Sequence, residues 1–181
     1  MREYQDEQIR EKTDRLENWM KLYGADVLHL AYSYVRNFHL AEDLTQDVFL
    51  RALTKMESFR GQSSVRTWLL SITANRCKDY LRSWSAKHEI SDTSPVEQKN
   101  KTSHDIQTEV ESKLEQDELW RIVTKLPIKY REVIILCYKR DLSGQETAEV
   151  LGLSEQAVRT RLHRARALLK DILEKEGYWN A

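Results

Sequence analysis

The sequence contains few of the residues that build tight turns. Five glycines and two prolines occur among 181 residues, which leaves little material for β-hairpins and closely spaced turns. We therefore expect an all-α fold. The aliphatic and aromatic content is ordinary, so a packed core is expected, and this length suits one medium domain or two small ones.

The sequence also lacks the patterns of disulfide scaffolds, membrane proteins and common catalytic sites. Cys77 and Cys137 lie far apart in segments of helical periodicity, so we expect two small buried hydrophobes. No apolar run approaches the ~20 residues of a membrane-spanning helix, and no signal-peptide apolar region follows the first methionine. The five histidines form no HxxxH or HExxH pair, and no GxxxxGK[ST] loop or nucleophile–base pair occurs. We expect a cytoplasmic protein that is no enzyme, needs no cofactor or metal and does not insert into membranes.

The formal net charge is zero, but the charges are segregated along the chain. Residues 51–84 hold seven basic and two acidic residues, and residues 121–140 hold six and one. Residues 85–120, between them, hold four basic and nine acidic residues. Separate basic blocks of this kind are typical of a protein that presents local faces to a polyanion.

Helical periodicity occupies two blocks separated by a polar stretch. Apolar residues recur at helical spacing from Leu16 to Trp84, which predicts three or four amphipathic helices. Residues 85–109 are polar and contain Pro95, a composition typical of a flexible linker. Periodicity resumes at Leu114. We expect an N-terminal extension (1–19), two small helical domains (20–84 and 112–175) joined by a flexible linker (85–111), and four helices in the second domain.

The segment Ser143–Lys170 has the pattern of a helix-turn-helix. Ser143 and Glu146 match a capping box, Gly152 is suited to end that helix, and Ser154 is suited to cap the next. In this motif the second helix lies in the major groove of DNA.

A helical wheel of the last of these helices separates a buried stripe from an outward face. The stripe is Val158, Leu162, Ala165 and Leu169, and the opposite face carries Gln156, Thr160 and Ala167 between basic flanks. The charges alone fit a solvated surface helix. The small and polar outward face, together with the capped preceding helix and its glycine turn, favours groove binding.

Two long motifs resemble one protein family. LSGQETAEVLGLSEQAVRTRLHRARALL is similar to region 4 of the sigma factors of bacterial RNA polymerase, specifically the extracytoplasmic-function (ECF) group. AEDLTQDVFLRAL, Ala41 to Leu53, resembles region 2.2, and SFRGQSSVRTWLLSITANRCKDYLR, Ser58 to Arg82, resembles regions 2.3 and 2.4. The resemblance covers residues 20–84 and 112–170.

The resemblance implies a factor that binds core RNA polymerase, at the β′ clamp helices and the β flap, and directs it to promoter DNA. Implied core-polymerase contacts are Asp43, Gln46, Asp47, Phe49 and Arg51. Implied −10 contacts are Phe59, Arg60, Gly61, Ser63, Ser64, Arg66, Thr67, Asn75, Arg76, Asp79 and Arg82, with the Phe59–Ser64 loop holding an extruded base. Implied −35 contacts are Gln156, Arg159, Thr160, His163 and Arg164, beside the basic flank residue Arg166. An anti-sigma factor is a further implied partner.

The chain departs from the family pattern at two places. Related sequences usually read WLYRIA where this chain has Trp68-Leu69-Leu70-Ser71-Ile72-Thr73, which affects the expected promoter melting. The residues before Trp19 extend beyond the usual start. Two alternatives are a stand-alone helix-turn-helix regulator, which leaves the first motif unexplained, and a helical nuclease, for which no carboxylate or histidine cluster is found.

Overall fold

The computed structural model describes residues 2–87 and 118–178. Within these ranges the chain is helical and contains no β-strand. The first range folds into a long helix, two further helices and a short 3₁₀ turn: α1 (Arg2–Val35), α2 (Phe38–Lys55), η1 (Met56–Ser58) and α3 (Val65–Lys87). The all-α prediction is confirmed.

The second range contains four helical segments, one of which ends in a π-helical turn. They are α5 (Glu118–Val123), α6 (Ile128–Ile134) continued by the π-helix η2 (Ile135–Lys139), α7 (Gly144–Leu151) and α8 (Glu155–Lys175). The expected linker lies outside the described residues, apart from its first three, which belong to α3. No helix in the described ranges is long and apolar enough to cross a membrane.

The predicted caps of the helix-turn-helix are confirmed. The Ser143 hydroxyl accepts from the Glu146 N–H over 3.2 Å, and the Glu146 carboxylate accepts from the Ser143 N–H over 2.8 Å. Gly152 ends α7 with φ of 63°, a left-handed conformation that glycine adopts without cost. The Ser154 hydroxyl accepts from the Ala157 N–H over 3.1 Å and so begins α8.

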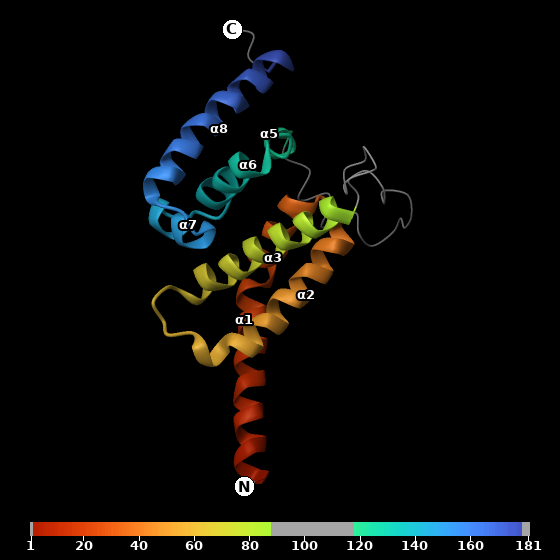
Figure 1. The fold of residues 1–181 in the computed structure, drawn as a ribbon, viewed down its shortest axis with the longest axis vertical. Coiled ribbons are helices and arrows are strands. Elements are labelled where there is room, and N and C mark those ends of the chain that lie inside the picture. The colour runs from red at the N-terminus through yellow and green to blue at the C-terminus, as the bar shows by residue number, and fades with distance from the viewer. Residues whose placement is uncertain (1, 88–117, 179–181) are drawn as a thin grey trace.

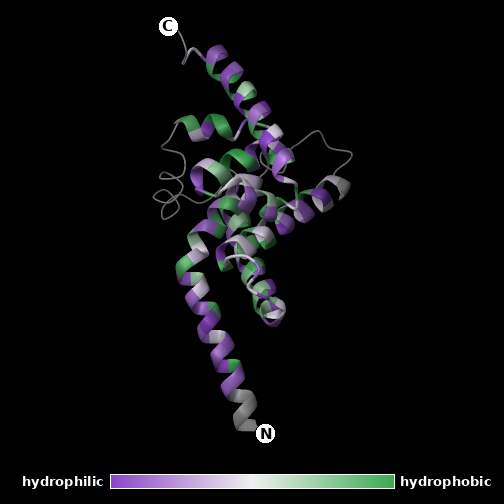
Figure 2. Cartoon of the chain, turned by 90° about the vertical axis from the view of Figure 1, so that its left-hand side faces the viewer, coloured by the Kyte–Doolittle hydropathy of each residue, from purple (hydrophilic) through white to green (hydrophobic). Residues whose placement is uncertain are grey.

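Helix α1 is longer than its periodicity predicted. The apolar pattern is interrupted at Gly24, yet the helix continues through it, because Trp19 before and Val27 after this residue are both buried in the core. The N-terminal part of α1 projects from the rest of the molecule (Figure 1), and those of its turns that carry a hydropathy colour are largely hydrophilic (Figure 2).

The two domains pack directly against each other. One buried cluster, which includes Trp19, Phe49 and Leu69, joins α1, α2 and α3. A larger cluster contains Leu70 of α3 and Val150 of α7, so it crosses from one domain to the other. Helix α3 contacts α7 and α1 contacts α6 (Figure 1).

Candidate polymerase and promoter interfaces

The outward face of α8 is available for a ligand along its length. Val158 and Ala165 are buried as the wheel predicted, and Leu162 and Leu169 are half-buried against the core. The six residues expected to bind the −35 element are all exposed: Gln156, Arg159, Thr160, His163, Arg164 and Arg166. One exposed face of a helix-turn-helix therefore carries three arginines beside small polar groups, which suits phosphates and base edges.

Arg161 lies on the same helix but serves a different purpose. Its Nη1 donates to the buried Glu132 carboxylate of α6 over 2.8 Å, which fixes α8 against α6. Arg161 therefore has a structural role, whereas Arg159, Arg164 and Arg166 lie exposed on the outward face of α8.

Tyr138 is a neighbour of the α8 face that the sequence did not reveal. Arg166 Nε donates to the Tyr138 hydroxyl over 2.9 Å, and the guanidinium lies 5.6 Å from the ring centroid. Tyr138 comes four residues after the buried Ile134, a spacing that predicts the same face in an α-helix. The wider π-helical turn breaks this register and leaves Tyr138 49% exposed.

The loop between η1 and α3 borders an open recess of about 370 Å³, within the size range of ligand pockets. Its walls are polar and aromatic, from Ser58, Phe59, Arg60, Gln62, Ser63 and Trp68. Gly61 adopts φ of 68°, which glycine provides without strain. A recess with aromatic faces, an arginine and small polar groups has the chemistry to hold an unstacked base.

Three aromatic rings, those of Trp19, Phe59 and Trp68, pack together at this recess. The Phe59 and Trp68 rings are 4.8 Å apart at 37°, and Trp19 of α1 packs edge-on against Trp68 at 5.7 Å. Trp68 has two roles, because it packs against the buried cluster of Trp19, Phe49 and Leu69 and also lines the recess.

The implied −10 residues of α3 divide into two groups. Asn75, Asp79 and Arg82 are exposed together, and Arg82 Nη2 donates to Asp79 over 3.0 Å. Arg66 instead pairs with Asp26 of α1 over 2.6 Å.

The structure corrects the implied −10 contact at Thr67. Its side chain is 3% exposed, and its hydroxyl lies 2.8 Å from the Ser64 hydroxyl, which also accepts the Thr67 N–H. The Ser64 and Thr67 hydroxyls are therefore hydrogen-bonded to each other at the start of α3. Thr67 has no exposed side-chain surface for a DNA strand.

The implied polymerase contacts on α2 also need one correction. Asp43, Gln46 and Arg51 are exposed and Asp47 is half-buried, but Phe49 is 3% exposed and packs in the core. It cannot be the exposed aromatic residue of a docking face. The pattern carried the signal, because Ala41, Leu44, Val48 and Phe49 follow the spacing of a buried stripe.

Leu50 takes the place expected for Phe49. It is 62% exposed and lies one turn after Gln46 on the same face as Asp43. An exposed leucine among polar and acidic residues is suited to anchor a helix-docking contact.

Asp47 of α2 joins the implied polymerase contacts to α3 through its ion pair with Arg76. Burial raises the pKa of its carboxyl, but hydrogen bonds and charge from Arg76 and Arg51 outweigh burial and lower it. The residue therefore carries a negative charge at neutral pH. Among the described residues, no group of His, Cys, Asp and Glu is arranged to hold a metal ion.

Comparison with known proteins decides the family. The Sigma-70 region 2 family matches residues 19–86, and the Sigma-70 region 4 family matches residues 116–169. The RNA polymerase sigma factor YlaC of Bacillus subtilis (strain 168) is 34% identical over 163 residues, which cover 90% of this chain and 94% of YlaC. The ECF RNA polymerase sigma factor SigM of the same organism is 31% identical over 159 residues, 86% of this chain and 93% of SigM. The chain belongs to the ECF sigma factors.

Two solved structures share the fold of this chain. CnrH, solved in complex with the cytosolic domain of CnrY, matches this chain with a TM-score of 0.67 and 25% identity over 91% of each chain. The sigma factor RpoE of Bartonella quintana, in complex with the anti-sigma factor NepR, has the same fold, with a TM-score of 0.67 over 87% of this chain and 96% of RpoE. As a sigma factor, the protein is not an enzyme but acts in promoter recognition and transcription initiation.

Proposed function

We propose that three exposed surfaces divide the work of this ECF sigma factor in the bacterial cytoplasm. The α2 face around Leu50, with Asp43, Gln46, Asp47 and Arg51, binds the clamp helices of core polymerase. The Phe59–Trp68 recess and the exposed face of α3 bind the −10 element, and α8 binds the −35 element. The recess carries this proposal most directly, because its polar and aromatic walls match the chemistry of an extruded base.

Capture of a flipped base gives a way to open the duplex without nucleotide hydrolysis. Unstacking a base costs a few kcal/mol, and stacking on an aromatic side chain returns roughly 1–3 kcal/mol per base. Phe59 and Trp68 supply the aromatic surface, Arg60 is placed for the backbone, and Ser63 offers a hydroxyl to a base edge. Because these terms nearly balance, the recess needs the rest of the complex to hold the strand nearby.

Core polymerase keeps the strand near the recess, because it binds the sigma factor and so holds both DNA-binding modules at the promoter. Two DNA-binding modules on one protein act at a high effective concentration once the first is bound. Attachment through α2, with the second domain held at the β flap, would present both modules to a promoter together. The division into domains 20–84 and 112–175 serves this arrangement.

An inhibitory protein is a further proposed partner, besides core polymerase and promoter DNA. CnrH was solved in complex with a second protein, and this likeness supports an anti-sigma factor for the present chain. The partner's residues and the surfaces it covers lie beyond that likeness.

Run-off transcription with purified core polymerase and a promoter library tests the proposed function. We expect initiation from a subset of templates only when the protein is present, and loss of initiation when the −10 or −35 element of a selected template is scrambled. Tight polymerase-independent binding to a palindromic operator, with no initiation, would favour the helix-turn-helix regulator instead.

A further inference from the structure

We propose that the cavity between the C-terminal part of α1 and the helices α5 and η2 binds a small anion that carries a phosphate group. This inference goes beyond the proposed function, because none of the residues that line the cavity is an implied polymerase or promoter contact. The cavity measures about 60 Å³, room for roughly four to six waters. A space of this size accommodates one phosphate group, and since the cavity is not fully enclosed, a larger molecule attached to that group also fits.

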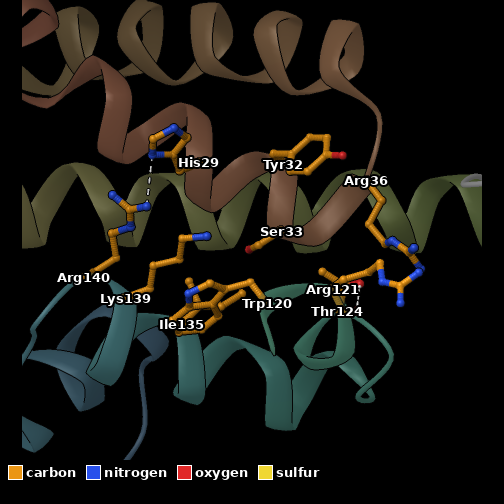
Figure 3. A pocket seen from close by; sticks show the side chains of 10 residues that line it. All are labelled: His29, Tyr32, Ser33, Arg36, Trp120, Arg121, Thr124, Ile135, Lys139 and Arg140. Carbon is orange, nitrogen blue, oxygen red and sulfur yellow. Dashed lines mark hydrogen bonds between the residues drawn. The ribbon is translucent and has the colours of Figure 1, made fainter. Parts of the chain in front are cut away.

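The cavity wall is rich in cations. Arg36, Arg121, Lys139 and Arg140 line it, and none of its ten lining residues is an aspartate or a glutamate (Figure 3). In Figure 3, Lys139 and Arg140 lie toward one end of the cavity and Arg36 and Arg121 toward the other, with Trp120 between them. Like charges that converge in this way repel one another and create a positive potential, so an anion placed between them is attracted.

Asp26 of α1 lies near this wall but does not neutralise it. One of its carboxylate oxygens accepts from Arg140 Nη1 over 2.6 Å, and the other accepts from Arg66 Nε over 2.6 Å. A single carboxylate therefore serves two arginines and leaves an excess of positive charge. Burial, together with the charges of Arg140 and Lys139, lowers the pKa of His29 to about 4, as expected beside such an excess.

Arg140 has a donor for which the protein offers no acceptor. The residue is 9% exposed, and its Nη2 lies 3.0 Å from Nδ1 of His29. Its Nε is buried and has no hydrogen-bond partner among the described residues. A buried donor without an acceptor is unfavourable, and more so when it belongs to a charged group. An oxygen of an anion in the cavity that Arg140 lines would satisfy this donor.

Arg36 reaches the cavity from a strained backbone position. Its φ is 49°, in the left-handed region that residues other than glycine adopt at a cost. Its N–H donates to the Tyr32 carbonyl over 2.7 Å, directly after the end of α1. Within the described part of the chain, no ion pair or hydrogen bond takes up its half-buried guanidinium. The strained conformation thus places a cation in the wall that is available to a ligand.

Aromatic rings in the wall widen the range of phosphate-bearing ligands. Tyr32 of α1 and Trp120 of α5 line the cavity, and Lys139 Nζ lies 4.7 Å from the centroid of the Trp120 ring. Planar bases stack on aromatic side chains, and cations beside them bind the attached phosphates. Two sources therefore share the required chemistry: inorganic phosphate, and the phosphate of a nucleotide whose base packs against Trp120.

Thermal unfolding of the full-length protein in the presence of three probes tests the proposal. The probes are inorganic phosphate, adenosine monophosphate and adenosine, with the ionic strength matched by sodium chloride. A ligand that binds only the folded protein raises the unfolding midpoint, by roughly 3–6 °C at about ten times its dissociation constant. We expect this rise with phosphate and with the monophosphate, and none with adenosine.

The relative affinities of the two active probes identify the source of the phosphate group. Tighter binding of the monophosphate than of inorganic phosphate would support a nucleotide ligand, and equal or weaker binding would support free phosphate. No rise with either anion would overturn the proposal. An equal rise with adenosine and its monophosphate would also overturn it, because the phosphate group would then contribute nothing.

Two double variants with the same change of charge show whether the anion binds in this cavity. Arg36→Gln with Lys139→Gln removes a cation from each end of the cavity. Arg10→Gln with Lys175→Gln is the matched control, because both residues are exposed, one on α1 and one on α8, and neither lines the cavity. We expect the first pair to weaken phosphate binding at least about tenfold through loss of charged contacts, and the control pair to retain wild-type affinity.

Each rise is measured against the variant's own midpoint without ligand, which also verifies that the variant is folded. If the cavity double variant does not fold, Arg36→Gln beside Arg10→Gln provides the same comparison on one helix. An unchanged rise in the cavity variant, or equal losses in the cavity and control variants, would assign the anion to general surface charge and overturn the proposal. Neither polymerase nor promoter DNA is needed, so failure of the proposed function would leave these results unchanged.

Discussion

Asp47 on α2 and Arg76 on α3 form an ion pair that joins two surfaces expected to bind different partners. Asp47 belongs to the proposed polymerase face, and Arg76 was implied as a −10 contact. Arg51 Nε donates to the same carboxylate over 3.2 Å. The carboxylate of Asp47 therefore fixes the orientation of α3 relative to the polymerase face.

Neutralising Asp47 should weaken both functions of the first domain. For Asp47→Asn we expect roughly a five- to thirtyfold loss of affinity for core polymerase, equivalent to about 1–2 kcal/mol for a charged hydrogen bond. The −10 strand should also bind more weakly, because Arg76 loses its fixed position. Biolayer interferometry with core polymerase and anisotropy with a labelled −10 strand measure the two effects. Arg82→Gln is the control, since it should affect the strand alone. Equal polymerase affinity for wild type and Asp47→Asn would contradict the assignment.

Leu50 and Phe49 provide a direct test of which side chain contacts polymerase. Leu50→Ser should reduce polymerase affinity roughly five- to thirtyfold, about 1–2 kcal/mol for an interface anchor, with little change in the unfolding midpoint. Phe49→Leu should do the reverse, because it removes buried volume and leaves the surface intact. Titration of labelled protein with polymerase, beside thermal melts, separates the two results. If Phe49→Leu were the variant that lost affinity at full stability, the correction made for Phe49 would itself be wrong.

Gly61 tests whether the shape of the −10 loop matters. A Cβ at this position meets no atom within 4 Å, but φ of 68° is strained for alanine by about 1–2 kcal/mol. Gly61→Ala should therefore shift the loop and reduce the fluorescence change of a 2-aminopurine placed at the flipped base of the −10 element. Gly144→Ala is the matched control, because Gly144 is the first helical residue of α7, has a negative φ and also has open space around its Cα. A Gly61→Ala protein with an unchanged base-flipping signal would show that the recess does not hold the base.

Arg159 and Arg161 differ in exposure on one helix and offer a pair of identical substitutions. Arg159→Ala should cost about 1–3 kcal/mol of −35 binding, or roughly five- to 150-fold, and lower the slope of log affinity against log salt by about 1. Its thermal midpoint should not change. Arg161→Ala should instead lower the midpoint, because it removes a partner from the buried Glu132. Electrophoretic mobility shifts of the polymerase complex over a salt series supply the affinities, and a result with the two variants exchanged would place the DNA on another face of α8.

Local features of the fold were predictable because they are decided within a few residues. The capping box at Ser143, the left-handed Gly152 and the Ser154 cap each depend on one turn of chain. The buried stripe of α8 follows from helical period for the same reason. Tyr138 could not be placed, because the π-helical turn changes the period at the position where it matters.

The contacts between the domains could not be predicted from the sequence. Tyr34 and Glu132 are 98 residues apart, and Asp26 and Arg140 are 114 apart. Lys, Arg, Asp and Glu occur throughout the chain, so no local pattern marks which of them pair. The charge segregation suggested separate faces for a polyanion, whereas part of the positive charge of residues 121–140 is used against the first domain.

His29 of α1, whose Nδ1 lies 3.0 Å from Arg140 Nη2, makes the stability of the folded protein sensitive to mild acid. Burial lowers the pKa of His29 from 6.5 to about 4, assisted by the charges of Arg140 and Lys139 and opposed by Asp26. Its folded state prefers the neutral ring, whose Nδ1 can accept from Arg140. Between pH 4 and 6.5 the unfolded chain binds more protons at His29 than the folded protein does. The stability that the neutral ring contributes is therefore fully present above pH 6.5 and is lost as the pH falls toward 4. The loss amounts to roughly 3 kcal/mol at most, from 1.36 kcal/mol per pKa unit. The free energy of unfolding measured in urea should be lower at pH 5.5 than at pH 7.5 for wild type, whereas for His29→Asn it should fall much less over the same interval. Their salt bridges and hydrogen bonds lower the pKa values of Asp26, Asp47 and Glu146, so these carboxylates stay charged at pH 5.5. Parallel changes for wild type and His29→Asn would therefore exclude His29 as the source.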